Sequence, residues 1–302
     1  MKRQGEWVSR LLRRACPRSD NMIYEIFNEN TRVKINSLGA ELRSIVHNGK
    51  ERAWQNEGGQ WAGCAILLFP FGGFNRMVYD GRDFGILKHG FCRNEEFTLV
   101  SRTDTEIEFT LSENERTLSV YPYGFTFNVR YTLVEGGYEI TYTVKNPTDR
   151  TIPFATGGHE SFSLDCEVTD CYIEFEKDES FDFMIHDNGG FLTGEKLHFA
   201  DGKILRLEEE YTKDSKTIIL GDINSRSVIL RKNATDEKVV ELRFDDYKNL
   251  LIWHPHGSRM VCIEPWQCLP SYADEIKEFS EREGVINLPS GGEISFTRRI
   301  TY

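Results

Sequence analysis

Few features of helical, membrane-spanning or nucleotide-binding proteins occur in this sequence. Among its 302 residues, no apolar run approaches the ~18 residues that span a bilayer. The glycine patterns that bind dinucleotides or nucleoside triphosphates are missing, as are the G-x-S-x-G and H-E-x-x-H motifs. We therefore expect no membrane partner and no bound cofactor.

The cysteine spacing typical of disulfide-stabilised folds or zinc sites is also missing. The chain has seven cysteines, an odd number, and no C-x-x-C pair. This argues against a disulfide framework and favours reduced thiols in a cytoplasmic protein. His254-Pro255-His256 suggests a metal, but no third histidine or cysteine follows at ligand spacing, so we predict no metal site.

Basic residues are fewer than acidic ones. Lys and Arg number 37 against 48 Asp and Glu, which gives a formal net charge of −11. An acidic surface repels phosphate backbones, so nucleic acid is not an expected partner. The composition fits a monomer or homodimer that binds a small neutral molecule.

Basic residues concentrate at the start of the chain, where residues 1–21 differ from the rest. This stretch is rich in arginine and has apolar residues at helical spacing. It is either an organellar targeting peptide or an extension upstream of the fold. We favour the extension, because a strand pattern begins at once in Ile23-Tyr24-Glu25-Ile26, and we expect residues 22–302 to form one domain.

Alternation of apolar and polar residues dominates the remaining sequence, as is typical of antiparallel strands. The clearest case runs from Phe125 to Leu133, turns at Glu135-Gly136-Gly137, and returns from Tyr138 to Val144. Asn146-Pro147 ends this predicted hairpin, because proline cannot donate to a ladder. Further strands are expected around residues 107–111, 218–220, 228–230, 239–242 and 294–296.

Helical patterns are scarce, and the best candidate runs from Ser271 to Arg282 before a stop at Gly284. No repeat or linker divides the chain. Many strands with few short helices predict an all-β fold, a large antiparallel β-sandwich.

Glu264 is the first candidate for chemistry. It follows the apolar run Val261-Cys262-Ile263 and precedes Pro265-Trp266. A glutamate at a buried strand end loses solvation, which raises its pKa towards that of a useful general base. The alternative is a structural glutamate in a salt bridge.

Two histidines lie in glycine- and aromatic-rich segments. His159 follows Gly157-Gly158, where the backbone can approach a ligand closely, and His89 precedes Gly90-Phe91. Imidazole is the natural acid at neutral pH. Either ring may instead be structural, His159 by packing on Phe154 and Phe162.

Arg76 and several tryptophans are candidates for sugar binding. Arg76 follows Phe71-Gly72-Gly73-Phe74-Asn75, a loop that suits hydrogen bonds to hydroxyl groups, although it may pair with a carboxylate. Trp54, Trp61, Trp253 and Trp266 offer flat apolar surfaces for a sugar ring, or else they are core residues.

Together these segments resemble the aldose 1-epimerase (galactose mutarotase) superfamily, and most closely its divergent bacterial branch. The matching stretches, in order, are Leu68-Phe69-Pro70-Phe71-Gly72-Gly73 with Asn75-Arg76, His89-Gly90-Phe91, Val144-Lys145-Asn146 leading to Pro153-Phe154, Gly157-Gly158-His159 with Phe162, and Cys262-Ile263-Glu264-Pro265-Trp266.

The resemblance implies a galactose mutarotase-like supersandwich with a sugar site on the concave face of one sheet, and a cofactor-independent isomerase. It implies that Glu264 takes the proton of the anomeric hydroxyl and that His159 protonates the ring oxygen. His89 would assist at that oxygen and Arg76 would orient hydroxyls. Apart from the resemblance, we expect Trp266, as one of the tryptophans above, to contact the substrate.

The chain departs from the family pattern in two places. The aspartate that holds substrate hydroxyls has only a loose match, at Asp245 or Asp246, and Pro265-Trp266 differs from the typical galactose enzyme. The identity of the sugar therefore stays open. A hexose 6-phosphate, with Arg76, Lys88 or Arg93 near its phosphate, is one alternative, and a non-catalytic carbohydrate-binding protein on the same scaffold is another.

Overall fold

Strands make up most of the computed structural model, which describes residues 22–59, 61–212 and 216–302. The predicted extension, residues 1–21, lies outside this part. The strands are β1 (Ile23–Phe27), β2 (Thr31–Asn36), β3 (Leu42–His47), β4 (Lys50–Glu51), β5 (Ala65–Leu68), β6 (Phe74–Tyr79), β7 (Arg82–Lys88), β8 (Thr98–Arg102), β9 (Glu106–Ser112), β10 (Thr126–Val134), β11 (Gly137–Lys145), β12 (Ile152–Phe154), β13 (Gly157–Ser163), β14 (Cys171–His186), β15 (Leu192–Arg206), β16 (Ile218–Leu220), β17 (Ser227–Lys232), β18 (Lys238–Arg243), β19 (Asn249–Trp253), β20 (Met260–Trp266), β21 (Ile286–Leu288) and β22 (Glu293–Thr301).

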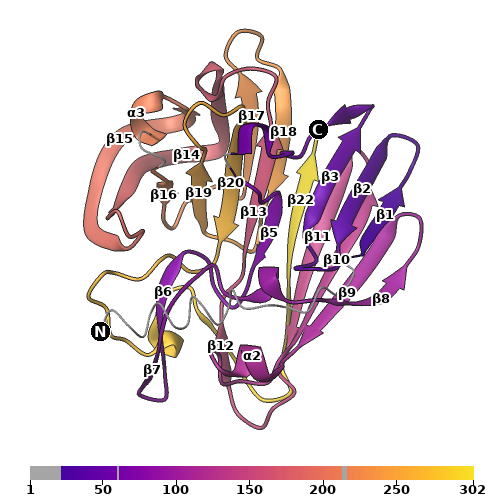
Figure 1. Cartoon of the computed structure of the whole chain (residues 1–302). Coiled ribbons are helices and arrows are strands. Elements are labelled where there is room, and N and C mark those ends of the chain that lie inside the picture. Colours follow the sequence, from indigo (N-terminus) through magenta and orange to yellow (C-terminus); the bar gives the residue numbers. More distant parts are fainter. Residues whose placement is uncertain (1–21, 60, 213–215) are drawn as a thin grey trace.

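Eighteen of these strands form one continuous sheet that folds over on itself. One layer runs β9–β10–β11–β22–β18–β17, and the other runs β2–β3–β5–β13–β20–β19–β16. The long strand β14 joins the layers, because residues 171–175 pair with β17 whereas Phe183 pairs with β16. In Figure 1, β14 and β16–β20 lie on one side of the molecule and β1–β3 with β8–β11 on the other. The predicted antiparallel β-sandwich is confirmed.

The predicted hairpin is present as β10 and β11, which pair from Thr126↔Lys145 to Val134↔Gly137. Gly136 has a φ of +77°, a conformation that glycine adopts without strain, so the Gly-Gly pair makes the tight turn. Apolar residues along both strands are buried at every second position. The other expected strands correspond to β9, β16, β17, β18 and β22, and all are confirmed.

The helix predicted from Ser271 to Arg282 is wrong. Within that range only a 3₁₀ turn forms, Phe279–Glu281. Phe279 is fully buried whereas Ile276 is 72% exposed, so the two do not share an apolar face. The Ser271 N–H instead donates to the Phe74 carbonyl (2.9 Å), and Leu192 forms an isolated bridge with Tyr272. These contacts with β6 and β15 replace helical hydrogen bonds.

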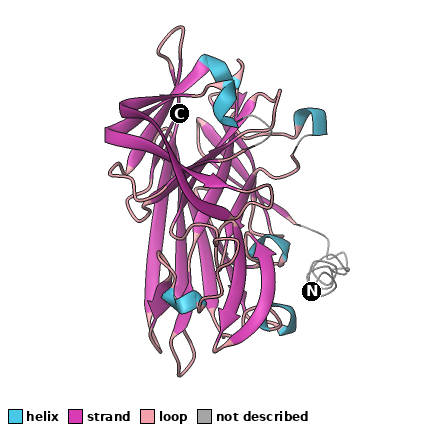
Figure 2. Cartoon of the chain, turned by 90° about the vertical axis from the view of Figure 1, so that its left-hand side faces the viewer, coloured by secondary structure: helices cyan, strands magenta, loops and turns pink. Residues whose placement is uncertain are grey.

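Helices in the described residues are short and peripheral, as Figure 2 shows. They are α2 (Glu115–Leu118), α3 (Glu209–Thr212) and the 3₁₀ turns Glu57–Gly59, Cys92–Asn94, Val168–Asp170 and Phe279–Glu281. None has the length and apolarity needed to cross a membrane.

The main core fills the space between the two layers and includes a buried ion pair. Arg298 Nη2 lies 2.7 Å from Glu160 Oε1, and both side chains are at most 5% exposed. Tyr142 and Tyr247 accept further hydrogen bonds from the Arg298 guanidinium, at 2.7 and 2.9 Å. Glu160 lies on β13, so the inner face of this strand carries a buried charge that pairs with Arg298 through one of its two carboxylate oxygens.

Candidate active site

A pocket with a volume of about 640 Å³ opens on the outer face of the β5–β13–β20–β19–β16 layer. Side chains alternate between the two faces of a strand, so while Glu160 on β13 points into the core, its neighbour His159 points to the pocket. Glu264 on β20 lies opposite Leu251 on β19, and His159 lies opposite Ile66 on β5. These four residues all line the pocket.

His159 and Glu264 meet at the floor of this pocket. His159 Nε2 lies 3.4 Å from Glu264 Oε2, and the side chains are 8% and 3% exposed. The two strands that carry them are adjacent, since β13 pairs directly with β20. The structure thus brings together the two residues that the sequence analysis singled out as base and acid.

Burial sets the protonation of this pair. Loss of solvent raises the pKa of Glu264 well above its usual range, and the negative charge of Glu160 adds to the effect. Burial also lowers the pKa of His159 to about 3, helped by the positive charges of Lys88 and Arg93. Both shifts favour the uncharged arrangement of the pair in the empty site, with a proton on the carboxyl group and none added to the imidazole.

His89 completes a cluster of three titratable groups. Its ring stands edge-on to that of His159 at 5.3 Å between centroids. The Gly73 N–H donates to His89 Nδ1 at 3.0 Å, so the neutral ring carries its proton on Nε2. Burial lowers the pKa of His89 well below its usual range, and His159 adds to this, which keeps the ring neutral.

The backbone at His89 is held in an uncommon shape. His89 and Gly90 have φ of +61° and +64°. A Cβ atom on Gly90 would lie 2.0 Å from the Phe69 carbonyl oxygen, so only glycine fits there. The Phe91 N–H donates to the same carbonyl at 3.0 Å, which fixes the turn against β5.

Tryptophans form the walls of the pocket. The Trp61 ring stacks on His159 at 4.8 Å, and Trp253 stands edge-on to Trp61 at 5.7 Å. Trp266 donates its indole N–H to the Gly158 carbonyl at 3.1 Å. A Cβ atom on Gly157 would come within 2.8 Å of the Trp266 indole, which explains the glycine beside the histidine.

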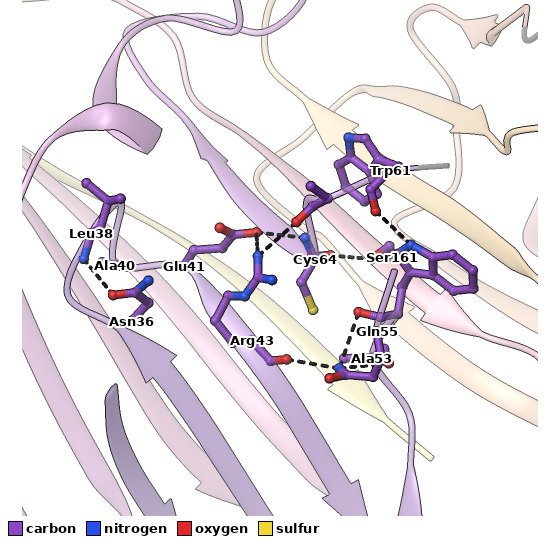
Figure 3. A network of polar contacts seen from close by, with 12 residues as sticks. Asn36, Leu38, Ala40, Glu41, Arg43, Ala53, Gln55, Trp61, Cys64 and Ser161 are labelled. Carbon is purple, nitrogen blue, oxygen red and sulfur yellow. Dashed lines mark hydrogen bonds and ion pairs between the residues drawn. The ribbon is translucent and has the colours of Figure 1, made fainter. Parts of the chain in front are cut away.

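Polar contacts hold the loop that carries Trp61 (Figure 3). The Trp54 indole N–H donates to the Trp61 carbonyl at 2.9 Å. Arg43 donates to the Ala62 carbonyl at 3.1 Å, and Glu41 accepts a hydrogen bond from the Cys64 N–H at 2.7 Å. The loop is thereby anchored to β3 and β13 on either side of the stacked ring.

Two predicted substrate-binding residues lie away from the pocket. Arg76 Nη2 pairs with Asp83 at 2.6 Å on the β6–β7 hairpin, and neither residue lines the cavity. Asp245 is exposed and pairs with Arg243 at 2.8 Å. Asp246 accepts a hydrogen bond from the Thr297 N–H at 2.8 Å, also outside the pocket.

Part of the pocket wall was not anticipated from the sequence. Residues 186–190, together with Lys216 and Thr217, line the pocket as well. The run Asp187-Asn188-Gly189-Gly190 is a turn signal, and Asp187 Oδ1 does accept the Gly189 and Phe191 N–H groups at 2.8 and 2.9 Å. A turn signal alone does not show that the turn lies beside a distant strand.

One group of side chains in the described residues has metal-ligand character. Single ligand atoms of His159, Cys262 and Glu264 lie within 4.8 Å of one another. Burial raises the pKa of the Cys262 thiol well above its usual range, and Glu264 raises it further. Two of these three groups are the carboxyl group and the imidazole at the floor of the pocket.

Sequence comparisons find a matching protein family and a similar known protein. Residues 22–285 match the family described as aldose 1-epimerase. The chain is 31% identical over 279 residues to the chromosomal LacX protein of Lactococcus lactis, which covers 84% of this chain and 90% of that protein.

Solved structures have the same fold. A galactose mutarotase related enzyme from Lactobacillus acidophilus is 28% identical, with a TM-score of 0.82 over 93% of this chain and 97% of that one. A galactose mutarotase-like protein from Lactobacillus casei is 25% identical, with a TM-score of 0.85 over 93% and 99%. A galactose 1-epimerase from L. acidophilus, at 15% identity and a TM-score of 0.68 over 94% and 96%, shares the fold. The chain belongs to the aldose 1-epimerase family.

Proposed function

We propose that this protein is an aldose 1-epimerase, an isomerase that interconverts the α and β anomers of an aldose without a cofactor. The observation that carries the proposal is the 3.4 Å contact between His159 and Glu264 at the floor of a buried pocket. The anomeric hydroxyl and the ring oxygen are bonded to the same carbon, so the groups that serve them must lie side by side.

Ring opening moves two protons. The Glu264 carboxylate takes the proton of the anomeric hydroxyl while the His159 imidazolium gives one to the ring oxygen. The bond between the anomeric carbon and the ring oxygen breaks, and its electron pair stays on the oxygen as the carbonyl forms. Rotation about the adjacent carbon–carbon bond exposes the other face of the carbonyl, and the reverse transfers close the ring.

The pair keeps one proton throughout this cycle. Reaction of the closed ring requires the proton on His159, the arrangement that the empty site favours less, and after opening the proton is on Glu264. Burial favours the neutral arrangement, with the proton on the carboxyl group, so transfer from imidazolium to carboxylate is not opposed by the site. His89 adds an Nε2–H donor for the ring oxygen, and the apolar faces of Trp61 and Trp266 suit the apolar face of a sugar.

The proposal is tested by polarimetry on freshly dissolved α-D-glucose, α-D-galactose and other aldoses, after subtraction of spontaneous mutarotation. The wild-type protein should speed the decay to an unchanged final rotation. Glu264→Gln should lower the rate about 10²–10⁴-fold, because the amide cannot accept the proton. Glu29→Gln, an exposed glutamate outside the pocket, is the matched control.

Affinity separates an enzyme from a carbohydrate-binding protein on the same scaffold. An epimerase retains sugar binding in Glu264→Gln while losing turnover, as titration calorimetry would show. Binding by the wild-type protein without acceleration of any free or phosphorylated aldose would overturn the proposal in favour of a binding protein.

A further inference from the structure

Positive side chains outnumber negative ones around the pocket. Lys88, Arg93 and Lys216 line it, against the carboxyl groups of Asp187 and Glu264. Three cations thus face two carboxyl groups, and burial favours the uncharged form of one of them by raising the pKa of Glu264. The pocket is therefore electropositive, whereas the chain as a whole has a formal charge of −11.

Lys88 and Arg93 stand out because no carboxylate among the described residues forms an ion pair with either. The Lys88 ammonium lies 5.0 Å from the centre of the Phe74 ring, which also lines the pocket. Arg93 is half-buried. By contrast, Arg76 on the neighbouring hairpin is paired with Asp83 at 2.6 Å. In an acidic protein, two adjacent cations without a carboxylate partner suggest that the partner is a ligand.

The two cations also repel each other. Lys88 is exposed, but partial desolvation lowers its pKa, the charge of Arg93 lowers it further, and the charge of Glu264 opposes this only in part. Burial lowers the pKa of Arg93 as well. An anion between an ammonium and a guanidinium group would relieve this cost and would receive charge-assisted hydrogen bonds from both.

We propose that the substrate of this pocket is an anionic aldose whose phosphate or carboxylate group binds Lys88 and Arg93. This inference rests on the proposed epimerase function and narrows its substrate class. The overall acidity of the chain favours a neutral ligand, but the charges that face the ligand decide its recognition, and these are positive.

The placement of the cations links binding to catalysis. Lys88 and Arg93 both disfavour the charged form of His159, in addition to the effect of burial. A bound anion would offset their charges and make it easier for His159 to carry the proton that it donates. An anionic aldose therefore gains in turnover as well as in affinity.

The test compares α/β exchange by NMR for neutral aldohexoses, their 6-phosphates and hexuronates. We expect one anionic class to have a kcat/KM at least about tenfold above its neutral parent, the effect of a charged hydrogen bond. Lys88→Gln should lower that value about tenfold more than it lowers the value for the neutral sugar. Lys34→Gln, an exposed lysine on β2, is the matched control. The phosphate and uronate arms identify which anion is recognised.

The experiment distinguishes failure of the anionic-substrate inference from failure of the proposed epimerase function. Equal kcat/KM for neutral and anionic sugars, or an equal effect of Lys88→Gln on both, would overturn this inference and leave the epimerase intact. If no aldose is accelerated, the epimerase proposal falls, and titration calorimetry with the same sugars decides the inference. Tighter binding of an anionic sugar, lost in Lys88→Gln, would support it, and equal or absent binding would overturn it.

Discussion

Two glutamates on adjacent strands, Glu160 on β13 and Glu264 on β20, are both buried but lie on opposite faces of one layer. Glu160 faces the core and pairs with Arg298 at 2.7 Å. Glu264 faces the pocket, where its contact is His159 at 3.4 Å.

In our account, the two faces of this layer have different roles: the face with Glu160 stabilises the fold, and the face with Glu264 carries the proposed chemistry. The Glu160 charge is matched by a guanidinium that never releases its proton, so this pair is fixed. Glu264 instead faces an imidazole, a group that can release its proton, so a proton can move between the two side chains. The strand alternation that places His159 and Glu160 on opposite faces produces both environments from consecutive residues.

The largest expected effect is on the catalytic face. His159→Gln should lower the mutarotation rate about 10²–10⁴-fold, because the amide keeps a hydrogen bond but cannot donate a proton to the ring oxygen. Polarimetry measures the rate, and circular dichroism confirms the fold. A rate within a few-fold of wild type would show that His159 is not the acid.

Substitutions on the core face of the layer should change the stability of the protein rather than its turnover. Arg298→Met leaves the Glu160 charge buried without a partner, which should cost about 3–5 kcal/mol in the free energy of unfolding. Adding Glu160→Gln should recover part of this loss. Denaturant unfolding measures both variants, and a single variant as stable as wild type would contradict the role given to the ion pair.

Substitution of a tryptophan in the pocket wall should have a smaller effect on turnover. Trp61→Ala removes the ring stacked on His159, an interaction of about 0.5–1.5 kcal/mol beyond the area it buries. We expect a loss of up to about tenfold in kcat/KM, partly restored in Trp61→Phe. Steady-state kinetics on the three proteins would decide, and a phenylalanine variant no better than alanine would argue against stacking.

The smallest expected effect is that of pH. The acidic limit appears only as pH falls towards the His159 pKa of about 3, where the pair gains a second proton. The basic limit appears only above the raised pKa of Glu264, where the pair loses its single proton. The rate should therefore be flat through neutral pH, and a rate that rises steeply between weakly acidic and neutral pH would contradict a shared proton.

Much of the fold, and the two residues of the proposed acid–base pair, could be singled out from the sequence because their signals are local. The β10–β11 hairpin follows from alternation and a Gly-Gly turn, and His159 and Glu264 lie in distinctive short segments. The direction of Arg76 could not be predicted, because a register shift between Arg76 and Val78 in the β6–β7 hairpin sets it. Asp245 finds its partner in Arg243, two residues earlier, on an exposed turn.

Tertiary contacts account for the remaining errors. Residues 271–282 have helical spacing, but their hydrogen bonds go to β6 and a bridge forms with Leu192. The sequence names Lys88 and Arg93 as candidates for binding a phosphate, but whether they lie on the pocket wall depends on the fold, and composition does not contain that information.

The most direct test of the account measures turnover and stability for Glu264→Gln and Glu160→Gln side by side. Burial favours the uncharged form of Glu264 by raising its pKa, so its amide replacement should leave unfolding nearly unchanged while turnover is lost. Glu160→Gln should lower the free energy of unfolding by about 3–5 kcal/mol while its folded molecules still turn over. If Glu264→Gln turns over normally, or both variants lose activity only in proportion to lost stability, the division between a catalytic and a structural glutamate is wrong.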